Sequence, residues 1–211
     1  MRGSTTKHKA KKSPDRERLS RERVIKAAIG IAETEGIEAV TMRRVASSLG
    51  SGVMSLYRHV LDRDDLLLGM LDDVAEAIEP PPLERDERAE ILAIMKAIHS
   101  EFREHPWIVK VLLFEGRGSL LILPLIERIF AALDRLGHAQ DSAIEIYSLL
   151  LHYCYGESLS FQTTAKRRSV QKQYPIAEFD EFPMIRAAYL AGDDWKYDEF
   201  ERNIKRILSA A

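Results

Sequence analysis

The segment TMRRVASSLGSGVMSLYRHVLDRDDLL, residues 41–67, decides the fold of this chain. Thr41 is a suitable N-cap for a first short helix, Gly50 interrupts it, and a second short helix is predicted from about Val53 to Val60. The apolar residues of both helices share one inner face: Val45, Ala46, Leu49, Leu56 and Val60. Two short helices joined by a tight, glycine-containing turn form a helix-turn-helix, in which one helix braces another that enters the DNA major groove.

The residues on either side of this segment complete a helical unit. Upstream, Ser20 caps a predicted helix with apolar residues at helical spacing, and Gly36 stands where a C-terminal glycine would end it. Downstream, Asp62 caps a fourth helix, which the three prolines at 80–82 stop. This fourth helix bridges the two halves of the chain.

The rest of the sequence predicts helices only. Every long apolar pattern after Leu83 has the helical period and no convincing strand is present, so we expect an all-α fold of about nine to ten helices. The candidate helices cover roughly 84–104, 106–114, 119–136, 140–165, 183–191 and 195–209. Residues 166–182 break the periodicity and are interpreted as a loop.

Charge is distributed unevenly along the chain. Residues 1–63 hold 14 Lys and Arg but 7 Asp and Glu, a net charge of +7, so the remainder must carry −9 to give the total of −2. A basic end joined to an acidic remainder is expected when one end meets a polyanion such as DNA. The alternative is a basic tail without a partner, because residues 1–18 are polar, charged and without apolar periodicity.

About 50 consecutive residues, from VIKAAIGIAETEG to LLLGMLD, resemble the N-terminal domain of the TetR (tetracycline repressor) family of transcriptional regulators. The features that carry the resemblance are Gly36, Thr41, RRVASSLG at 43–50, LYRHV at 56–60 and the sequence DDLL at 64–67. More weakly, HPWIVKVLL at 105–113 resembles the ligand-binding domain of members close to the tetracycline repressor. The resemblance implies a sequence-specific DNA-binding regulator, a repressor released from its operator by a small-molecule ligand. Activation in place of repression stays open.

The resemblance also implies domains and DNA contacts. We expect a disordered basic tail at 1–18, a three-helix helix-turn-helix DNA-binding domain at 19–65, and a helical ligand-binding and dimerisation domain at 66–211. Arg43 would reach a base edge or a phosphate, and Arg63 would hold a phosphate. The predicted DNA-binding residues are Thr41, Arg43, Ser51, Val53, Met54, Ser55, Tyr57, Arg58, His59 and Arg63.

One pair of residues departs from the family pattern. Ser51 and Gly52 stand where the family usually has an apolar residue followed by a polar cap. Glycine is an acceptable N-cap, so the helix can start, but the missing apolar residue predicts a looser turn. Val53 and Met54 offer no hydrogen bonds, so base reading there would rest on thymine methyl contact and on shape.

The C-terminal half carries the aromatic side chains that a ligand pocket needs, although most of them are expected to be plain core. The pocket candidates are His99, Trp107, Phe114, Tyr147, Leu151, His152 and Tyr155. Helices 140–165 and 195–209 have more apolar surface than one face requires. The apolar residues of the second are Trp195, Phe200, Ile204, Ile207 and Leu208. In the resembling family, two such helices from each subunit form a four-helix bundle, which implies a homodimer on a palindromic double-stranded operator.

Other function classes fit less well. No GxSxG, GxGxxG, P-loop or HExxH pattern is present, so an enzyme is not expected. A scaffolding protein would explain the helices but not the charge polarity or LYRHV. His99, His105 and His152 lack metal-ligand spacing, so no metal and no cofactor are predicted. Cys154 lies in an apolar run as a core thiol, and without an apolar run of about 18 residues we expect a cytoplasmic protein rather than a membrane protein.

Overall fold

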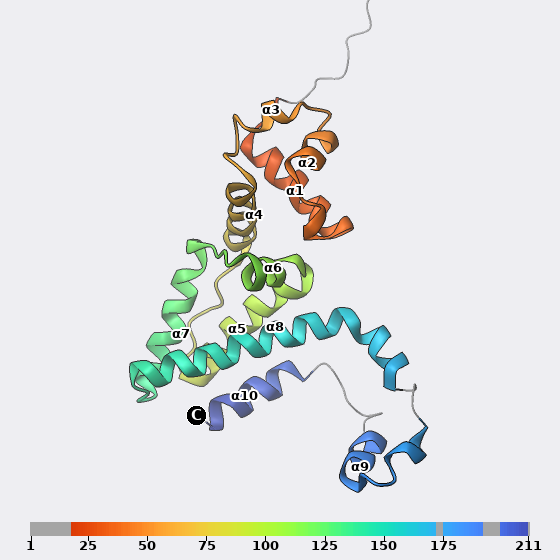
Figure 1. Cartoon of the computed structure of the whole chain (residues 1–211). Coiled ribbons are helices and arrows are strands. Elements are labelled where there is room, and N and C mark those ends of the chain that lie inside the picture. The colour runs from red at the N-terminus through yellow and green to blue at the C-terminus, as the bar shows by residue number, and fades with distance from the viewer. Residues whose placement is uncertain (1–17, 172–174, 192–198, 211) are drawn as a thin grey trace, which may run out of the picture.

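The computed structural model describes residues 18–171, 175–191 and 199–210, and within these ranges every regular element is helical (Figure 1). The ten α-helices of these ranges are α1 (Arg21–Glu35), α2 (Met42–Ser48), α3 (Val53–Leu56), α4 (Arg63–Ala77), α5 (Glu87–Glu104), α6 (Trp107–Lys110), α7 (Leu123–Arg135), α8 (Gln140–Gln171), α9 (Pro183–Ala191) and α10 (Phe200–Ala210). Short turns of helix are η1 (Ile37–Ala39), η2 (Val111–Glu115), η3 (Leu120–Ile122) and η4 (Ile176–Phe179). The predicted all-α architecture is confirmed.

The first three helices form one end of the molecule, and α4 connects them to the rest (Figure 1). The side chains of Ser20, Thr41 and Asp62 accept hydrogen bonds from the first turns of α1, α2 and α4, so the three predicted N-caps are confirmed. A Cβ at Gly69 would lie 2.8 Å from Ile25 Cδ1. Glycine at this position therefore lets α4 approach α1 closely.

The remaining helices enclose a second core. Helices α5, α7 and α8 pack against one another, and α10 lies along α5 and α8. Large, fully buried side chains of this core include Ile91, Ile94, Met95, Ile129, Leu133, Leu150 and Ile204. None of the described helices is long and apolar enough to cross a membrane.

Several predicted boundaries were wrong. Helix α8 continues to Gln171, beyond the predicted end at 165, so the first part of the expected loop 166–182 is helical. The segment KRRSVQ lacks apolar periodicity, but Lys, Arg and Gln are good helix formers and extend an existing helix at little cost. A short turn of helix, η4, interrupts the same predicted loop.

Other boundaries shifted in smaller ways. The predicted helix 106–114 is α6 followed by the wider π-helical turn η2. The predicted helix 119–136 begins as η3 and continues as α7. The start of the predicted helix 195–209, including Trp195, and the predicted tail 1–18 up to residue 17 lie outside the described residues.

Candidate nucleic-acid interface and ligand cavity

The turn between α2 and α3 is closed by backbone hydrogen bonds. Gly50 adopts φ +59°, a left-handed conformation that favours glycine. The Gly50 N–H donates to the Ser47 carbonyl at 3.1 Å, and the Ser51 N–H donates to the Ala46 carbonyl at 2.9 Å. These two bonds are the Schellman pattern of a helix C-terminus. The turn therefore forms without the apolar residue that the family usually has, and the looser turn predicted from Ser51 is not seen.

The surface that follows the turn faces outward. Met54 is 79% exposed and Tyr57 is 45% exposed, whereas Leu56 and Val60 are buried as the braced side predicts. Val53 is half-buried against the core, so it has less free surface for a DNA groove than the sequence predicted. The predicted helix Val53–Val60 is shorter, because α3 ends at Leu56 and the chain turns through 57–59. We call residues Ser51–His59 the reading surface.

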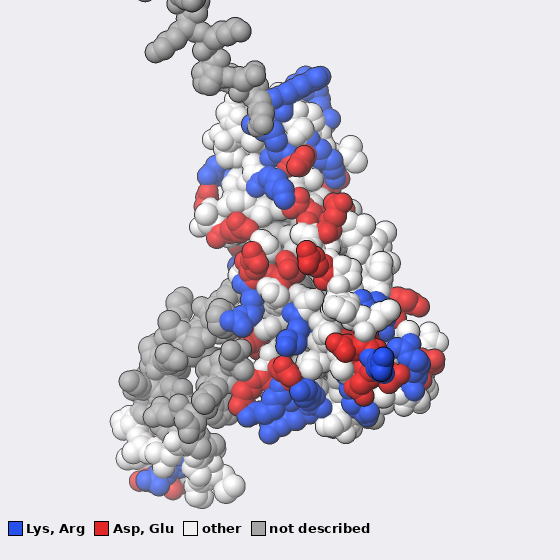
Figure 2. Space-filling model, turned by 180° about the vertical axis from the view of Figure 1, so that it is seen from behind, with Lys and Arg blue, Asp and Glu red and all other residues white. Residues whose placement is uncertain are grey.

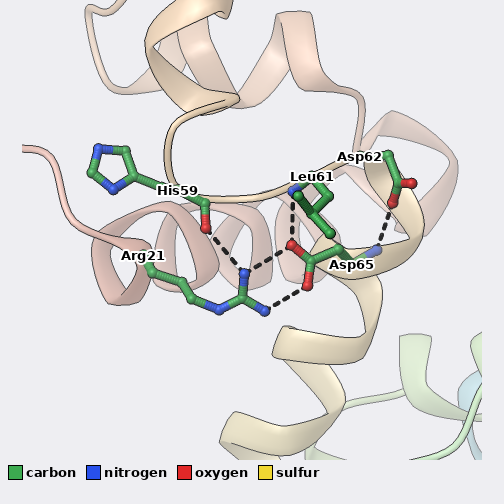
Figure 3. A network of polar contacts seen from close by, with 5 residues as sticks. All are labelled: Arg21, His59, Leu61, Asp62 and Asp65. Atoms are coloured by element: carbon green, nitrogen blue, oxygen red, sulfur yellow. Dashed lines mark hydrogen bonds and ion pairs between the residues drawn. The ribbon is translucent and has the colours of Figure 1, made fainter.

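The far end of the reading surface is fixed by a polar network that sequence reasoning missed (Figure 3). Both terminal nitrogens of Arg21 donate to the carboxylate of Asp65, at 2.8 and 2.7 Å, and Arg21 Nη1 also donates to the His59 carbonyl at 3.0 Å. The Leu61 N–H donates to Asp65 Oδ2 at 2.8 Å. The hydrogen bonds from Arg21 hold the pKa of Asp65 below its ordinary value. The imidazole of His59 points away from this network.

Three basic residues near the reading surface have different surroundings. Arg43, on α2, is exposed and makes no hydrogen bond or ion pair within the described part of the chain. Arg44 donates to Glu35, with Nε 3.0 Å from Oε2, so it pairs locally. Arg58 makes only a long hydrogen bond, 3.3 Å, to the Ser55 hydroxyl. Arg43 and Arg58 are therefore available to a phosphate.

Arg63 has internal partners that its predicted phosphate contact did not anticipate. Its Nε donates to the Val40 carbonyl at 3.1 Å, and Nη1 lies 3.1 Å from Glu115 Oε1. Because Nε and Nη1 of the guanidinium already donate within the chain, Arg63 would have to share these donors to contact DNA. Its observed contacts join α4 to Val40, which follows η1, and to η2.

Further ion pairs join the N-terminal helices to α6 and its flanks. Lys110 Nζ donates to Glu38 Oε1 at 2.9 Å, and His105 Nδ1 lies 3.0 Å from Glu33 Oε1. Arg117 pairs with Asp64. Figure 2 shows Lys and Arg gathered at the end of the molecule formed by the first helices, with a band of Asp and Glu below them.

An apolar cavity of about 240 Å³ lies between α4 and the second core. The residues that line it, in chain order, are Leu71, Val74, Ala75, Ile78, Ile98, Glu101, Phe102, Ile108, Leu112, Gly118, Ser119, Ile122, Leu123, Ile126, Tyr147, Leu151 and Tyr155. Among the described residues the lining contains no Lys, Arg or His, and Glu101 is its only carboxylate. The last turns of α4 thus form one wall of a site that can hold a small apolar molecule.

Three of the seven predicted pocket residues line this cavity: Tyr147, Leu151 and Tyr155. The other four do not, for four physical reasons. Trp107 is buried in the core, and Phe114 is 80% exposed. His99 is buried between α8 and α10, where it pairs with Glu157 of α8 and stacks on Phe200 of α10. His152 lies on the exposed side of α8.

The polar groups of the cavity differ in what they can offer. The Ser119 hydroxyl already donates to Asp72 Oδ1 at 2.6 Å. Burial raises the pKa of Tyr147, and it raises the pKa of Tyr155 to about 12, so both phenols stay neutral. Burial also raises the pKa of Glu101.

The two helices predicted for dimerisation use their apolar residues differently. On α10, Phe200, Ile204 and Leu208 are buried within the chain itself, so its expected excess of apolar surface is not found in the described residues. On α8, Ile144 and Leu149 remain about half exposed. Cys154 is buried as predicted, and burial raises the pKa of its thiol to about 12.

Known proteins resemble this chain over most of its length. The chain is similar to the HTH-type transcriptional repressor DrrR1 of Streptomyces coeruleorubidus, with 31% identity over 207 residues that cover 90% of this chain and 76% of that protein. It is 25% identical to an HTH-type transcriptional regulator of Saccharopolyspora erythraea over 209 residues, covering 94% of this chain and 87% of the relative.

Solved structures share the fold. Apo ActR from Streptomyces coelicolor is 25% identical and superposes with a TM-score of 0.73, covering 91% of this chain and 94% of its own. ActR is also solved in complex with actinorhodin. A family model described as the tetracyclin repressor-like C-terminal domain matches residues 80–209. The chain therefore belongs to the TetR family of transcriptional regulators.

Proposed function

We propose that this chain is a homodimeric repressor that acts in the cytoplasm, binds a palindromic operator through its reading surface, and is released by a small apolar ligand. The observation that carries the proposal is the position of α4. Its first turn holds the reading surface through Asp65, and its last turns line the cavity through Leu71 and Val74. One helix therefore contacts both the DNA-binding end at 19–65 and the ligand end at 66–211.

Operator binding is assigned to an outward surface. Tyr57, Met54 and Arg43 are exposed and face away from the core, so they can enter a major groove about 12 Å wide. Two subunits joined through the exposed Ile144 and Leu149 of α8 would present two such surfaces. A palindrome with half-sites about 34–36 Å apart, or a multiple of that distance, matches this arrangement.

Release is assigned to a small tilt of α4. The 15 residues of α4 span about 22 Å at about 1.5 Å per residue. A tilt of about 10° at the cavity end would then move the reading end by about 4 Å, which is enough to misplace a helix in a groove. A ligand that binds the tilted state more tightly shifts the dimer toward it. The complex of the relative ActR with actinorhodin supports a small-molecule ligand for this fold.

A selection from random DNA duplexes tests the DNA half of the proposal. The immobilised protein should enrich an inverted repeat, and binding to it should weaken steeply with salt while keeping a large ratio over scrambled DNA. Arg43→Ala should lower operator affinity by about 1–3 kcal/mol, whereas Arg44→Ala, whose side chain is held by Glu35, should lower it less. Failure to enrich any sequence, or equal losses in both variants, would refute the assignment.

A further inference from the structure

The cavity contains a charge that the protein itself scarcely neutralises. The carboxylate of Glu101 makes one ionic contact within the described residues, with His105, at 4.0 Å between Oε2 and Nε2. That distance is too long for a direct hydrogen bond. His105 is at the same time held on its other ring nitrogen by Glu33 of α1. The Glu101 side chain is 22% exposed, so it is partly buried in an apolar wall without a close partner. This arrangement carries a cost, because burial disfavours the charged form.

The neighbouring residues relieve little of this cost. No Lys or Arg of the described residues lines the cavity. Burial raises the pKa of Glu101, the distant His105 lowers it in part, and Glu104, the next acid along α5, raises it again by repulsion. The other polar groups of the wall are a serine already bonded to Asp72 and two neutral phenols. An anionic ligand would therefore meet a like charge and no counter-ion.

Two aromatic rings that line the same cavity as Glu101 suit a cation as well. Phe102 and Tyr155 both line the cavity, and their ring centroids lie 5.5 Å apart in a tilted arrangement. Ring faces attract ammonium groups that have left water, and a carboxylate beside them supplies a charge-assisted hydrogen bond. The aliphatic walls from α4 and η3 would enclose the apolar part of the same molecule.

We propose that the effector is a ring-bearing apolar amine, cationic near neutral pH, whose ammonium group is held by the carboxylate of Glu101 while its apolar body fills the cavity. This inference rests on the proposed ligand site and adds the chemical class of the ligand. The bound ammonium replaces the distant His105 as the partner of Glu101. Because His105 also contacts Glu33 at the end of α1, the exchange alters a contact between the ligand end and the DNA-binding end.

A matched pair of probes isolates the charge. Naphthylethylamine and naphthylethanol have the same ring and nearly the same size, but only the amine is cationic at pH 7. Calorimetric titration of the wild-type dimer should show the amine binding about 10- to 100-fold more tightly, the scale of a hydrogen bond between charged groups. Glu101→Gln should bring the two affinities to within about threefold, mainly by weakening the amine.

The control is Glu104→Gln, which removes the same charge from the same helix but lies on its exposed side. This variant should keep most of the preference for the amine. Equal affinities for the two probes on the wild type, or a preference that survives in Glu101→Gln, would overturn the amine proposal while leaving the ligand site in place. If neither probe bound any of the three proteins, the ligand site and the amine proposal would both fail.

Naphthylethanol also reports whether the Glu101→Gln cavity is intact. The neutral probe should bind this variant with nearly wild-type affinity, since its contacts are with the apolar walls. If the variant lost both probes together, Glu101 would be a structural residue and the proposal would be wrong. In a complex with a selected operator, the amine should release the wild-type protein at lower concentration than the alcohol does, and Glu101→Gln should abolish that difference.

Discussion

The end of the reading surface depends on Asp65, and Asp65→Ala removes its support. The carboxylate accepts two hydrogen bonds from Arg21 and one from the Leu61 N–H. Arg21 in turn holds the carbonyl of His59, the last residue of the reading surface. The substitution therefore removes the bond between Leu61 and α4, and it removes the partner that orients Arg21 of α1 toward His59 (Figure 3).

The expected loss in the free energy of unfolding follows from these contacts. The side chain of Asp65 is 21% exposed but that of Arg21 is 45% exposed, so the bidentate pair is worth about 1 kcal/mol rather than the value of a buried pair. The charged bond to the Leu61 N–H adds about 1 kcal/mol. We expect a loss of about 2 kcal/mol in the free energy of unfolding, or roughly 4–8 °C in Tm for a domain of this size.

Operator affinity should fall as well, by about tenfold, because the loosened residues around His59 must be ordered again on binding. Asp73→Ala is the matched control. Asp73 is also an α4 aspartate that pairs with a basic residue of α1, with Lys26 Nζ 2.8 Å from Oδ2, but it contacts no residue of the reading surface. This control should lose under about 0.5 kcal/mol and should bind the operator normally.

The stability difference should also depend on pH. Arg21 lowers the pKa of Asp65 in the folded state, so the pair contributes fully above the unfolded pKa of about 3.9. The contribution is lost as the pH falls through the lower folded value. Urea unfolding should therefore show a constant gap between wild type and Asp65→Ala from about pH 5 to pH 7 that narrows in more acidic solution. A gap equal to that of Asp73→Ala, with unchanged operator binding, would refute the role given to this network.

Three further predictions concern other parts of the molecule. Gly50→Ala should cost about 1 kcal/mol by urea unfolding and should weaken operator binding, because alanine is strained at φ +59°; an unchanged midpoint would contradict this. Arg128→Ala should lower the free energy of unfolding by about 3 kcal/mol, because it leaves the buried Glu90 without the guanidinium that lies 2.7 Å away. The control Arg135→Ala removes an exposed ion pair and should lower it by under about 0.5 kcal/mol, so equal losses would count against the buried pair. Glu101→Gln should raise the free energy of unfolding relative to wild type. The difference should grow as the pH rises from the unfolded pKa of about 4.3 through the raised folded pKa, because the charged carboxylate is the form that burial disfavours. A difference independent of pH would show that Glu101 is not desolvated.

Local chemistry explains why much of the N-terminal unit was predictable. N-caps and the turn glycine act within a few residues of their own helix, so Ser20, Thr41, Asp62 and Gly50 were identified from the sequence. The end of α3 was not, because the turn at 57–59 is held by Arg21, which lies far away in the sequence. Periodicity records which face of a helix is buried but not where a distant side chain stops the helix.

The contacts of Arg63 show the same limit for function. Its place before a helix and beside the motif predicted a phosphate contact, and that remains a prediction. The structure adds Val40 and Glu115 as partners from two other segments. A charge that looks free in the sequence can thus already be used in the fold, and only the folded arrangement distinguishes Arg63 from Arg43.

Aromatic residues were a poor guide to the residues that line the cavity, although the sequence contains a better signal. Aromatic side chains served as the search signal, yet their direction depends on how several helices pack, and only three of the seven candidates line the cavity. A better signal lies on α5. Its buried stripe includes Ile94 and Ile98, and Glu101 continues that stripe three residues later, where an apolar residue is expected.

Acids within an apolar stripe need a partner, and α5 has two of them. Glu90 is satisfied inside the chain, because Arg128 and the Glu84 N–H both donate to its carboxylate. Glu101 has only the distant His105, and it is the one that faces the cavity. Glu101 is only partly buried, with 22% of its side chain exposed, and its one ionic contact is a distant one. Since an apolar wall disfavours a charge that nothing close neutralises, the contrast between these two acids favours a partner for Glu101 that comes from outside the chain.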